Sequence, residues 1–168
     1  LFPYTTLFRS VGVANLQTLM GNIYWRKGLE KESLSILHEA LASLEDIYGK
    51  EHIKLAKVLN ELSFVYHLES NYTKASLYAN RAMKIMTNAG EKWHLELARA
   101  YENHAAILRE QEKFDENIEY FKKALEIKER YKGKDSDMEL GMTLNRLGRS
   151  YYEKEDKVTS EKYYLRGK

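Results

Sequence analysis

The sequence predicts an all-α fold, an α-solenoid of stacked antiparallel helix pairs with about four repeats. Three observations support this prediction. Apolar residues recur at intervals of three and four, the spacing of one face of a helix. The pattern returns about every 42 residues, and such self-similarity is typical of helical repeat proteins. Small residues return in the same register, at positions where two helices can approach closely.

The clearest element is the segment Phe114–Leu125, with the sequence FDENIEYFKKAL. One helix face collects its apolar residues, and Asp, Glu and Lys cover the other face. These apolar residues are Phe114, Ile118, Phe121, Ala124 and Leu125. The same layout occurs 42 residues earlier as YTKASLYANRAM and, more weakly, at the end of the chain as KVTSEKYYLRGK. A repeated amphipathic helix is therefore the building unit of the chain.

In chain order, the repeats cover residues 11–52, 53–94, 95–137 and 138–168, the last one truncated, and together form one domain. Each repeat is predicted to be a pair of helices. The first helices are predicted at Val11–Lys27, Lys54–Leu68, Leu95–Gln111 and Met138–Lys154. The second helices are predicted at Glu30–Tyr48, Tyr72–Asn88, Phe114–Tyr131 and Lys157–Lys168.

Aligned positions determine the register of the repeats. The first helices contain the strings LMGNIY, ELSFVY, NHAAIL and RLGRSY, whose last residues lie 42, 42 and 43 residues apart. A small residue stands three positions before each of these ends: Gly21, Ser63, Ala105 and Gly148. The second helices carry small residues at the same spacing: Ala40, Ala82, Ala124 and Gly167. We expect the small residues to let the paired helices approach closely.

We call positions that recur in every repeat columns. These columns resemble those of the tetratricopeptide repeat. The resemblance is to the longer variant found in kinesin light chains, because the period is 42 residues rather than about 34. The linkers YGKEH, AGEKWH and KGKDSD resemble those of that variant. The resemblance covers Val11 to Lys168 and implies a right-handed superhelix whose first helices line a concave groove. The proline that usually closes each repeat is replaced by Glu45, Thr87 and Glu129, which let the second helix continue.

The first ten residues, LFPYTTLFRS, resemble the in-frame translation of a sequencing adapter. They contain the only proline of the chain, Pro3, and show no helical periodicity. We therefore expect residues 1–10 to be an artefact or a disordered tail. On this interpretation the chain is a fragment.

Composition disfavours several classes of protein. The 27 basic and 25 acidic residues give a formal net charge of +2, so no strong field favours nucleic acid or a membrane surface. There is no cysteine, and no apolar run approaches the roughly 18 residues that span a bilayer. No nucleophile motif, phosphate loop or metal-ligand spacing occurs. We expect a cytoplasmic protein without enzymatic activity, cofactor or metal, and the sequence indicates no oligomeric state.

Five histidines occur in the chain, and none is predicted to bind a metal. His52 and His94 occupy the same repeat position in two linkers, where satisfying the start of the next helix is the expected role. His104 stands in a core column that usually holds Leu, so we expect its side chain to be buried and hydrogen-bonded.

The resemblance implies a peptide-binding groove along the first helices. Asparagines there would clamp a peptide backbone, because an amide offers both a donor and an acceptor. The candidate residues are Asn22, Trp25, Arg26, Lys57, Asn60, Phe64, Arg99, Arg109, Asn145, Arg149 and Tyr152. Five of them are basic, and they outnumber the acidic Glu102, Glu110 and Glu153 on this face. This balance favours an acidic peptide, and a solvated face without a ligand is the alternative.

The predicted function is a protein–protein interaction scaffold that binds a peptide or protein segment in the concave groove. The alternative is a regulatory or sensor repeat domain from a larger protein, in which the effector domain lies elsewhere. If the full reading frame contains only more repeats, the scaffold function is favoured. If it contains an appended catalytic or DNA-binding domain, the regulatory function is favoured.

The register makes a prediction about stability. Leu62→Ala or Phe121→Ala is expected to lower the free energy of unfolding by about 2–5 kcal/mol, because each side chain occupies a core column. Chemical denaturation measures the change. A thermal melt that neither substitution alters would contradict the register.

Overall fold

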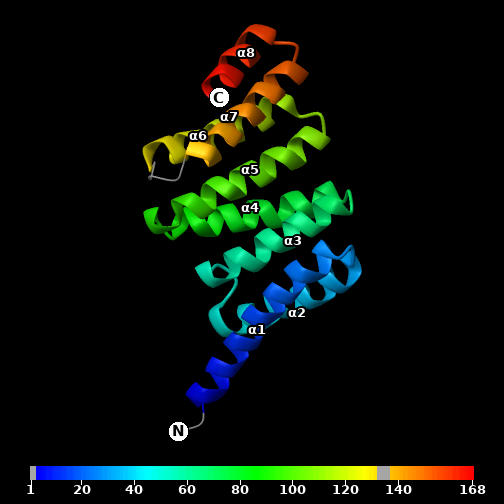
Figure 1. The fold of residues 1–168 in the computed structure, drawn as a ribbon. Helices are drawn as coiled ribbons and strands as arrows, with labels where there is room; N and C mark the ends of the chain where they lie inside the picture. The colour runs from blue at the N-terminus through cyan, green and yellow to red at the C-terminus, as the bar shows by residue number, and fades with distance from the viewer. Residues whose placement is uncertain (1–2, 132–136) are drawn as a thin grey trace. The chain divides into compact units, whose positions relative to one another are not determined.

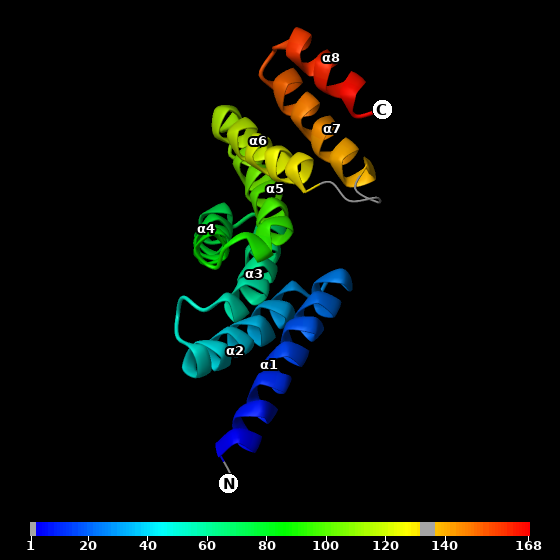
Figure 2. The same ribbon diagram turned by 90° about the vertical axis from the view of Figure 1, so that its left-hand side faces the viewer.

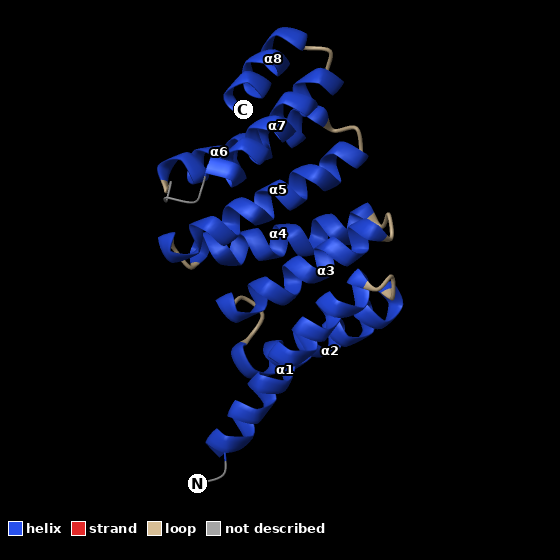
Figure 3. Ribbon diagram, in the orientation of Figure 1, coloured by secondary structure: helices blue, strands red, loops and turns tan. Residues whose placement is uncertain are grey.

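The computed structural model describes residues 3–131 and 137–168 (Figure 1). Within these residues the regular elements are all helices, joined by short loops (Figure 3). The α-helices are α1 (Pro3–Arg26), α2 (Glu30–Tyr48), α3 (Ala56–Leu68), α4 (Tyr72–Asn88), α5 (His94–Glu110), α6 (Phe114–Arg130), α7 (Asp137–Glu153) and α8 (Lys157–Arg166). Two short 3-10 helices, η1 (Ile53–Leu55) and η2 (Glu91–Trp93), precede α3 and α5.

The helices follow the predicted pattern closely. α2 and α4 begin and end at the predicted residues, and α6 and α8 end one and two residues early. The largest difference is at α1, which begins at Pro3 rather than at Val11. Proline is tolerated in a first helical turn, where its missing N–H has no intrahelical acceptor. The origin of the first ten residues stays a prediction, and the linker over residues 132–136 lies outside the described residues.

The chain forms two compact units, Leu1–Ala89 and Gly90–Lys168, each with two helix pairs. In the first unit, α1 packs against α2 and α3 against α4, and α2 also packs against α3 (Figure 1). In the second unit, α5 packs against α6 and α7 against α8, with α6 against α7 (Figure 2). Within each unit, the second helix of one repeat thus contacts the first helix of the next.

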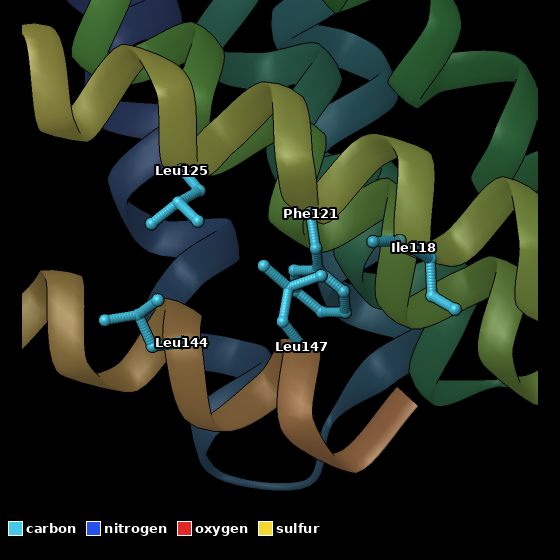
Figure 4. Close-up of a cluster of buried hydrophobic side chains, with 6 residues drawn as sticks. Ile118, Phe121, Leu125, Leu144 and Leu147 are labelled. Carbon is cyan, nitrogen blue, oxygen red and sulfur yellow. The ribbon is translucent and has the colours of Figure 1, made fainter. Parts of the chain in front are cut away.

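Apolar side chains fill these interfaces. In the second unit, Ile118, Phe121 and Leu125 of α6 face Leu144 and Leu147 of α7 (Figure 4). Full burial of such a side chain contributes roughly 1.5–3 kcal/mol. In the first unit the buried residues include Leu37, Leu41 and Leu44 of α2 and Leu59 and Leu62 of α3. The predicted core positions Leu62 and Phe121 are therefore confirmed as buried.

The column of small residues brings the paired helices close together. A Cβ added at Gly21 would lie 2.5 Å from Cγ of Leu37, so even alanine needs this leucine to move. At Gly148 an added Cβ would lie 3.0 Å from the ring of Tyr164. One turn further on, aromatic rings stack across two of the helix pairs, as Tyr66 on Tyr78 and Tyr151 on Tyr163. In these two helix pairs a pair of stacked rings therefore follows the small residue by about one turn.

One buried hydrogen bond also joins the two helices of every repeat. In each case a side chain donates to a backbone carbonyl of the other helix, 12 residues away in the sequence. The pairs, donor first, are Ser33 to Gly21 (2.8 Å), Ser63 to Ala75 (2.9 Å), Asn117 to Ala105 (2.6 Å) and Ser160 to Gly148 (2.8 Å). In the second repeat the donor is on the first helix, and in the others on the second. The acceptor carbonyls are at positions where the small residues leave room for the donor.

Two of the residues that replace the usual proline form ion pairs. Glu45 of α2 pairs with Arg81 of α4 at 2.5 Å, and Glu129 of α6 pairs with Arg166 of α8 at 2.7 Å. Both pairs join the second helices of consecutive repeats near the surface. Such pairs typically contribute at most about 1 kcal/mol each. These glutamates thus extend the second helix and also link it to the next repeat.

The recurrent hydrogen bond can be tested at Ser33. Ser33→Ala is expected to lower the free energy of unfolding by about 1 kcal/mol, because a buried hydrogen bond to the Gly21 carbonyl is lost. Ser35→Ala is the matched control on the same helix, since Ser35 is exposed, and a change within about 0.5 kcal/mol is expected there. Urea denaturation measures both. Equal losses at the two serines would contradict a structural role of this bond.

Candidate functional site

In the first unit, the predicted binding residues gather on one face formed by two consecutive first helices. α1 contributes three of them and α3 the other three, and the two helices pack against each other. We call this the α1–α3 face, and it consists of Asn22, Trp25, Arg26, Lys57, Asn60 and Phe64. The rings of Trp25 and Phe64 meet with their centroids 4.7 Å apart and an interplanar angle of 56°. The spacing of three and four residues places each set on one side of its helix.

Glu61 lies at the centre of this face, although the sequence did not single it out. Its Oε2 accepts a hydrogen bond from Nδ2 of Asn22 at 3.0 Å and another from Nε1 of Trp25 at 3.3 Å. The Arg26 guanidinium lies 5.4 Å from the centroid of the Trp25 ring, within reach of a cation–π interaction. Glu61 directly follows Asn60, but only the approach of α1 to α3 shows that it reaches the predicted residues. The Asn22 amide therefore already donates one hydrogen bond within the protein.

Lys57 and Asn60 complete the face. Lys57 is exposed and Asn60 is half-buried. Neither has a hydrogen-bond or ion-pair partner among the residues that the structure describes. Asn60 therefore keeps both its amide donor and its carbonyl acceptor available, which a clamp on a peptide backbone requires.

In the second unit, the predicted residues form the α5–α7 face, which consists of Arg99, Arg109, Asn145, Arg149 and Tyr152. Each of its arginines already contacts a carboxylate. The pairs are Arg99 with Glu139 (2.9 Å), Arg109 with Glu110 (2.6 Å) and Arg149 with Glu153 (2.9 Å). The sequence showed the excess of basic residues but not these contacts. An acidic ligand would have to compete with the paired glutamates.

Asn145 and Tyr152 are exposed on α7. The Asn145 side chain lies beside the end of α8, since a Cβ added at Gly167 would be 2.6 Å from its Oδ1. Together with Met138 and Met142 it lines an open pocket of about 650 Å³. Asn145 is therefore shared between the α5–α7 face and the edge of the last helix pair.

Glu102 is not a groove residue, and this prediction is wrong. Its side chain is 7% exposed and lies between three helices. Nζ of Lys128 on α6 lies 3.0 Å from Oε1, and Nη1 of Arg146 on α7 lies 3.3 Å from Oε2. The Thr143 hydroxyl donates to Oε1. Helical spacing put Glu102 in the same column as Asn60, but the side chains of α6 and α7 enclose it.

His104 is buried as predicted, but without the expected hydrogen bond. The edge of its ring meets the ring of Tyr120 at a centroid distance of 4.6 Å and an angle of 87°. Nδ1 is buried and has no partner in the described part of the chain. Burial, and to a smaller extent the charge of Lys113, lowers the pKa of His104 to about 4. The ring is therefore neutral near pH 7 and packs in the core as an aromatic residue.

The linker histidine of the first unit has the expected structural role. Nδ1 of His52 accepts a hydrogen bond from the backbone N–H of Lys54, at the start of η1. Among the described residues, no three acidic or histidine side chains come together in a way that could hold a metal ion. None of the described helices has the length and apolar character needed to cross a membrane.

Comparison with known proteins identifies the repeat. The family model described as tetratricopeptide repeat matches residues 12–88 and 96–167. No curated protein matches the sequence.

Solved structures of similar fold include three proteins. BtubC (BKLC) from P. vanneervenii is 19% identical, with a TM-score of 0.84 over 92% of this chain and 61% of that one. The apo form of RapI is 20% identical, with a TM-score of 0.80 over 92% and 54%. A kinesin light chain-like protein of Podosopora anserina with nearly identical TPR-like repeats is 12% identical, with a TM-score of 0.67 over 91% and 92%. At these identities the similarity concerns the fold alone. The chain spans less than two thirds of the first two proteins.

The buried network of Glu102 makes a prediction. Lys128→Met is expected to lower the free energy of unfolding by about 3 kcal/mol, because it removes one partner of a buried carboxylate. Methionine fits the position, since Met86 occupies the same column one repeat earlier. The double variant with Glu102→Leu should recover much of this loss, because an apolar pair can replace a buried ion pair at little cost. Urea denaturation compares the two variants, and equal destabilisation would contradict the pairing.

Proposed function

Because the chain belongs to the tetratricopeptide repeat family, whose members generally act as scaffolds for protein interaction, we propose that it binds a peptide or protein segment along its first helices. The observation that carries this proposal is the α1–α3 face. On that face an aromatic pair, an amide with no partner and two basic side chains lie together without being fully buried. A merely solvated helix face has no need of a tryptophan and a phenylalanine in contact at its surface.

The α1–α3 face offers three kinds of interaction to one extended segment. An apolar side chain can pack on the rings of Trp25 and Phe64, and large aromatic residues are frequent anchors of protein interfaces. The Asn60 amide can donate to and accept from a peptide unit. Lys57 and Arg26 can attract a carboxylate of the ligand. The acidic preference of the proposed ligand therefore rests on these two basic residues.

The α5–α7 face is the weaker candidate. Its arginines are held by Glu110, Glu139 and Glu153, so its charge toward a ligand is largely balanced. Tyr152 and Asn145 remain exposed there. We propose that this face binds a ligand more weakly than the α1–α3 face does.

A regulatory repeat domain within a longer protein is the second candidate function. The observation in its favour is that the chain spans 61% and 54% of two similar structures. In such a protein the same faces would bind a ligand and transmit binding to an effector domain. The full reading frame distinguishes the two candidates, because only the second requires an effector domain.

The α1–α3 face can be tested with peptides selected from a phage-displayed library on the full chain. Trp25→Ala is expected to weaken their binding at least tenfold, since it removes a central aromatic anchor. Asn60→Ala is expected to weaken binding about 2–10-fold, which corresponds to the loss of one or two hydrogen bonds. Fluorescence anisotropy measures the dissociation constants, and circular dichroism verifies the fold of each variant.

Asn80→Ala is the matched control, because Asn80 is exposed on the second helix α4. It should leave the dissociation constant unchanged. Charge reversal of Arg99 and Arg109 tests the α5–α7 face in the same assay. If substitutions on both first-helix faces leave binding unchanged and a substitution on a second helix abolishes it, the proposed site is wrong.

A further inference from the structure

Glu61 brings a negative charge to the α1–α3 face, whose own charged members are both basic. Its Oε2 accepts hydrogen bonds from Asn22 and Trp25, and both of these donors are neutral. The side chain is half-buried, and Oε1 has no partner among the residues that the structure describes. Within the same residues, neither Lys57 nor Arg26 forms an ion pair with it. The carboxylate is therefore not paired with a cation in the described part of the chain.

Neither the repeat nor the two hydrogen bonds require a carboxylate at this position. The same column holds Leu19, Asn103 and Arg146 in the other repeats. A glutamine amide has an oxygen that can accept from the same two donors. The negative charge of Glu61 is thus a feature of this face and not of the repeat.

Glu102 shows what a covered carboxylate requires in this protein. Lys128 and Arg146 lie 3.0 Å and 3.3 Å from its two oxygens. Removing a carboxylate from water without such partners is costly. A segment that packs on the Trp25 ring also covers Glu61, because the indole bonds directly to its carboxylate. A well-fitting ligand must therefore bring a donor to Oε1, and a cationic side chain supplies the strongest one.

The spacing on α3 indicates how the charges of such a ligand are arranged. Lys57 and Glu61 are four residues apart, and so about 6 Å apart along the helix axis. In an extended peptide, side chains two residues apart point to the same side at a distance of about 6.5–7 Å. Asn60 lies between them in the sequence and has its amide donor and acceptor available. An extended segment leaves peptide groups free to meet this amide, whereas a helix bonds them internally.

Resting on the proposed function, we propose that the ligand of the α1–α3 face is an extended segment with a basic and an acidic residue two positions apart. The basic side chain pairs with Glu61 and the acidic side chain with Lys57. A neighbouring apolar residue packs on the rings of Trp25 and Phe64. The preferred ligand thus has mixed charge rather than acidic residues throughout, and Glu61 determines this specificity.

The test uses a phage-displayed library of random peptides, selected in parallel on the unaltered full chain and on Glu61→Gln. Glutamine keeps an acceptor for Asn22 and Trp25 but removes the charge. On the unaltered chain we expect enrichment of Lys or Arg two positions from Asp or Glu. On Glu61→Gln the enrichment of Lys or Arg should be lost. Glu32→Gln is the matched control, since Glu32 is exposed on the second helix α2, and it should select the same peptides as the unaltered chain.

A synthetic copy of the peptide that binds the unaltered chain most tightly measures the size of the effect. Replacing its basic residue by glutamine should weaken binding to the unaltered chain about tenfold, because a hydrogen bond to a charged group is lost. The same replacement should weaken binding to Glu61→Gln by less than about twofold. Fluorescence anisotropy measures the dissociation constants. The result on the unaltered chain does not depend on how any variant folds, and circular dichroism verifies the fold of Glu61→Gln.

The outcomes separate this inference from the proposed function. Peptides that Trp25→Ala releases, but whose basic and acidic residues are absent or three or four positions apart, would overturn the inference and leave the proposed function intact. Equal losses on the unaltered chain and on Glu61→Gln when the basic residue is replaced would do the same. If no peptide is selected, or if Trp25→Ala leaves binding unchanged, the proposed function and this inference are both wrong.

Discussion

The hydrogen bond between the paired helices is the constraint on which each repeat depends. It can form only where one helix of the pair exposes a backbone carbonyl to the other, and this requires a small residue at that turn. The bond length and the sequence separation recur in all four helix pairs, although the donor is serine in three of them and asparagine in one. In the second repeat Ser63 supplies both the small residue and the donor. The bond therefore determines how closely and in which register each pair packs.

Close packing of each helix pair determines which of its side chains pack against the next pair and which remain available to a ligand. Within each unit, the second helix of the first repeat packs against the first helix of the next repeat through apolar side chains, such as those of α6 and α7 (Figure 4). Polar residues at these junctions must then be satisfied inside the protein. Glu102 shows this most clearly, because Lys128, Thr143 and Arg146 surround its carboxylate. A column that carries potential ligand contacts in one repeat thus carries a buried ionic network in another.

The α1–α3 face combines aromatic, amide and charged groups, and in the proposed function these groups bind an extended segment with varied side chains. The exposed apolar residues Val13, Leu16, Met20 and Ile23 lie on a different side of α1.

The sequence by itself determined the helices, the repeat register and the core, because periodicity records which residues are shielded from water. It also predicted the residues of the α1–α3 face, since helical spacing places Asn22 beside Trp25 and Asn60 beside Phe64. Only the tertiary structure decided how these groups are paired. Glu61 reaches Asn22 and Trp25 from the neighbouring first helix, Lys128 encloses Glu102, and glutamates hold the arginines of the α5–α7 face. The contacts of Glu61, Lys128 and Arg99 join residues 26–40 positions apart, and the pattern along one helix carries no information about which side chain of another helix will meet it.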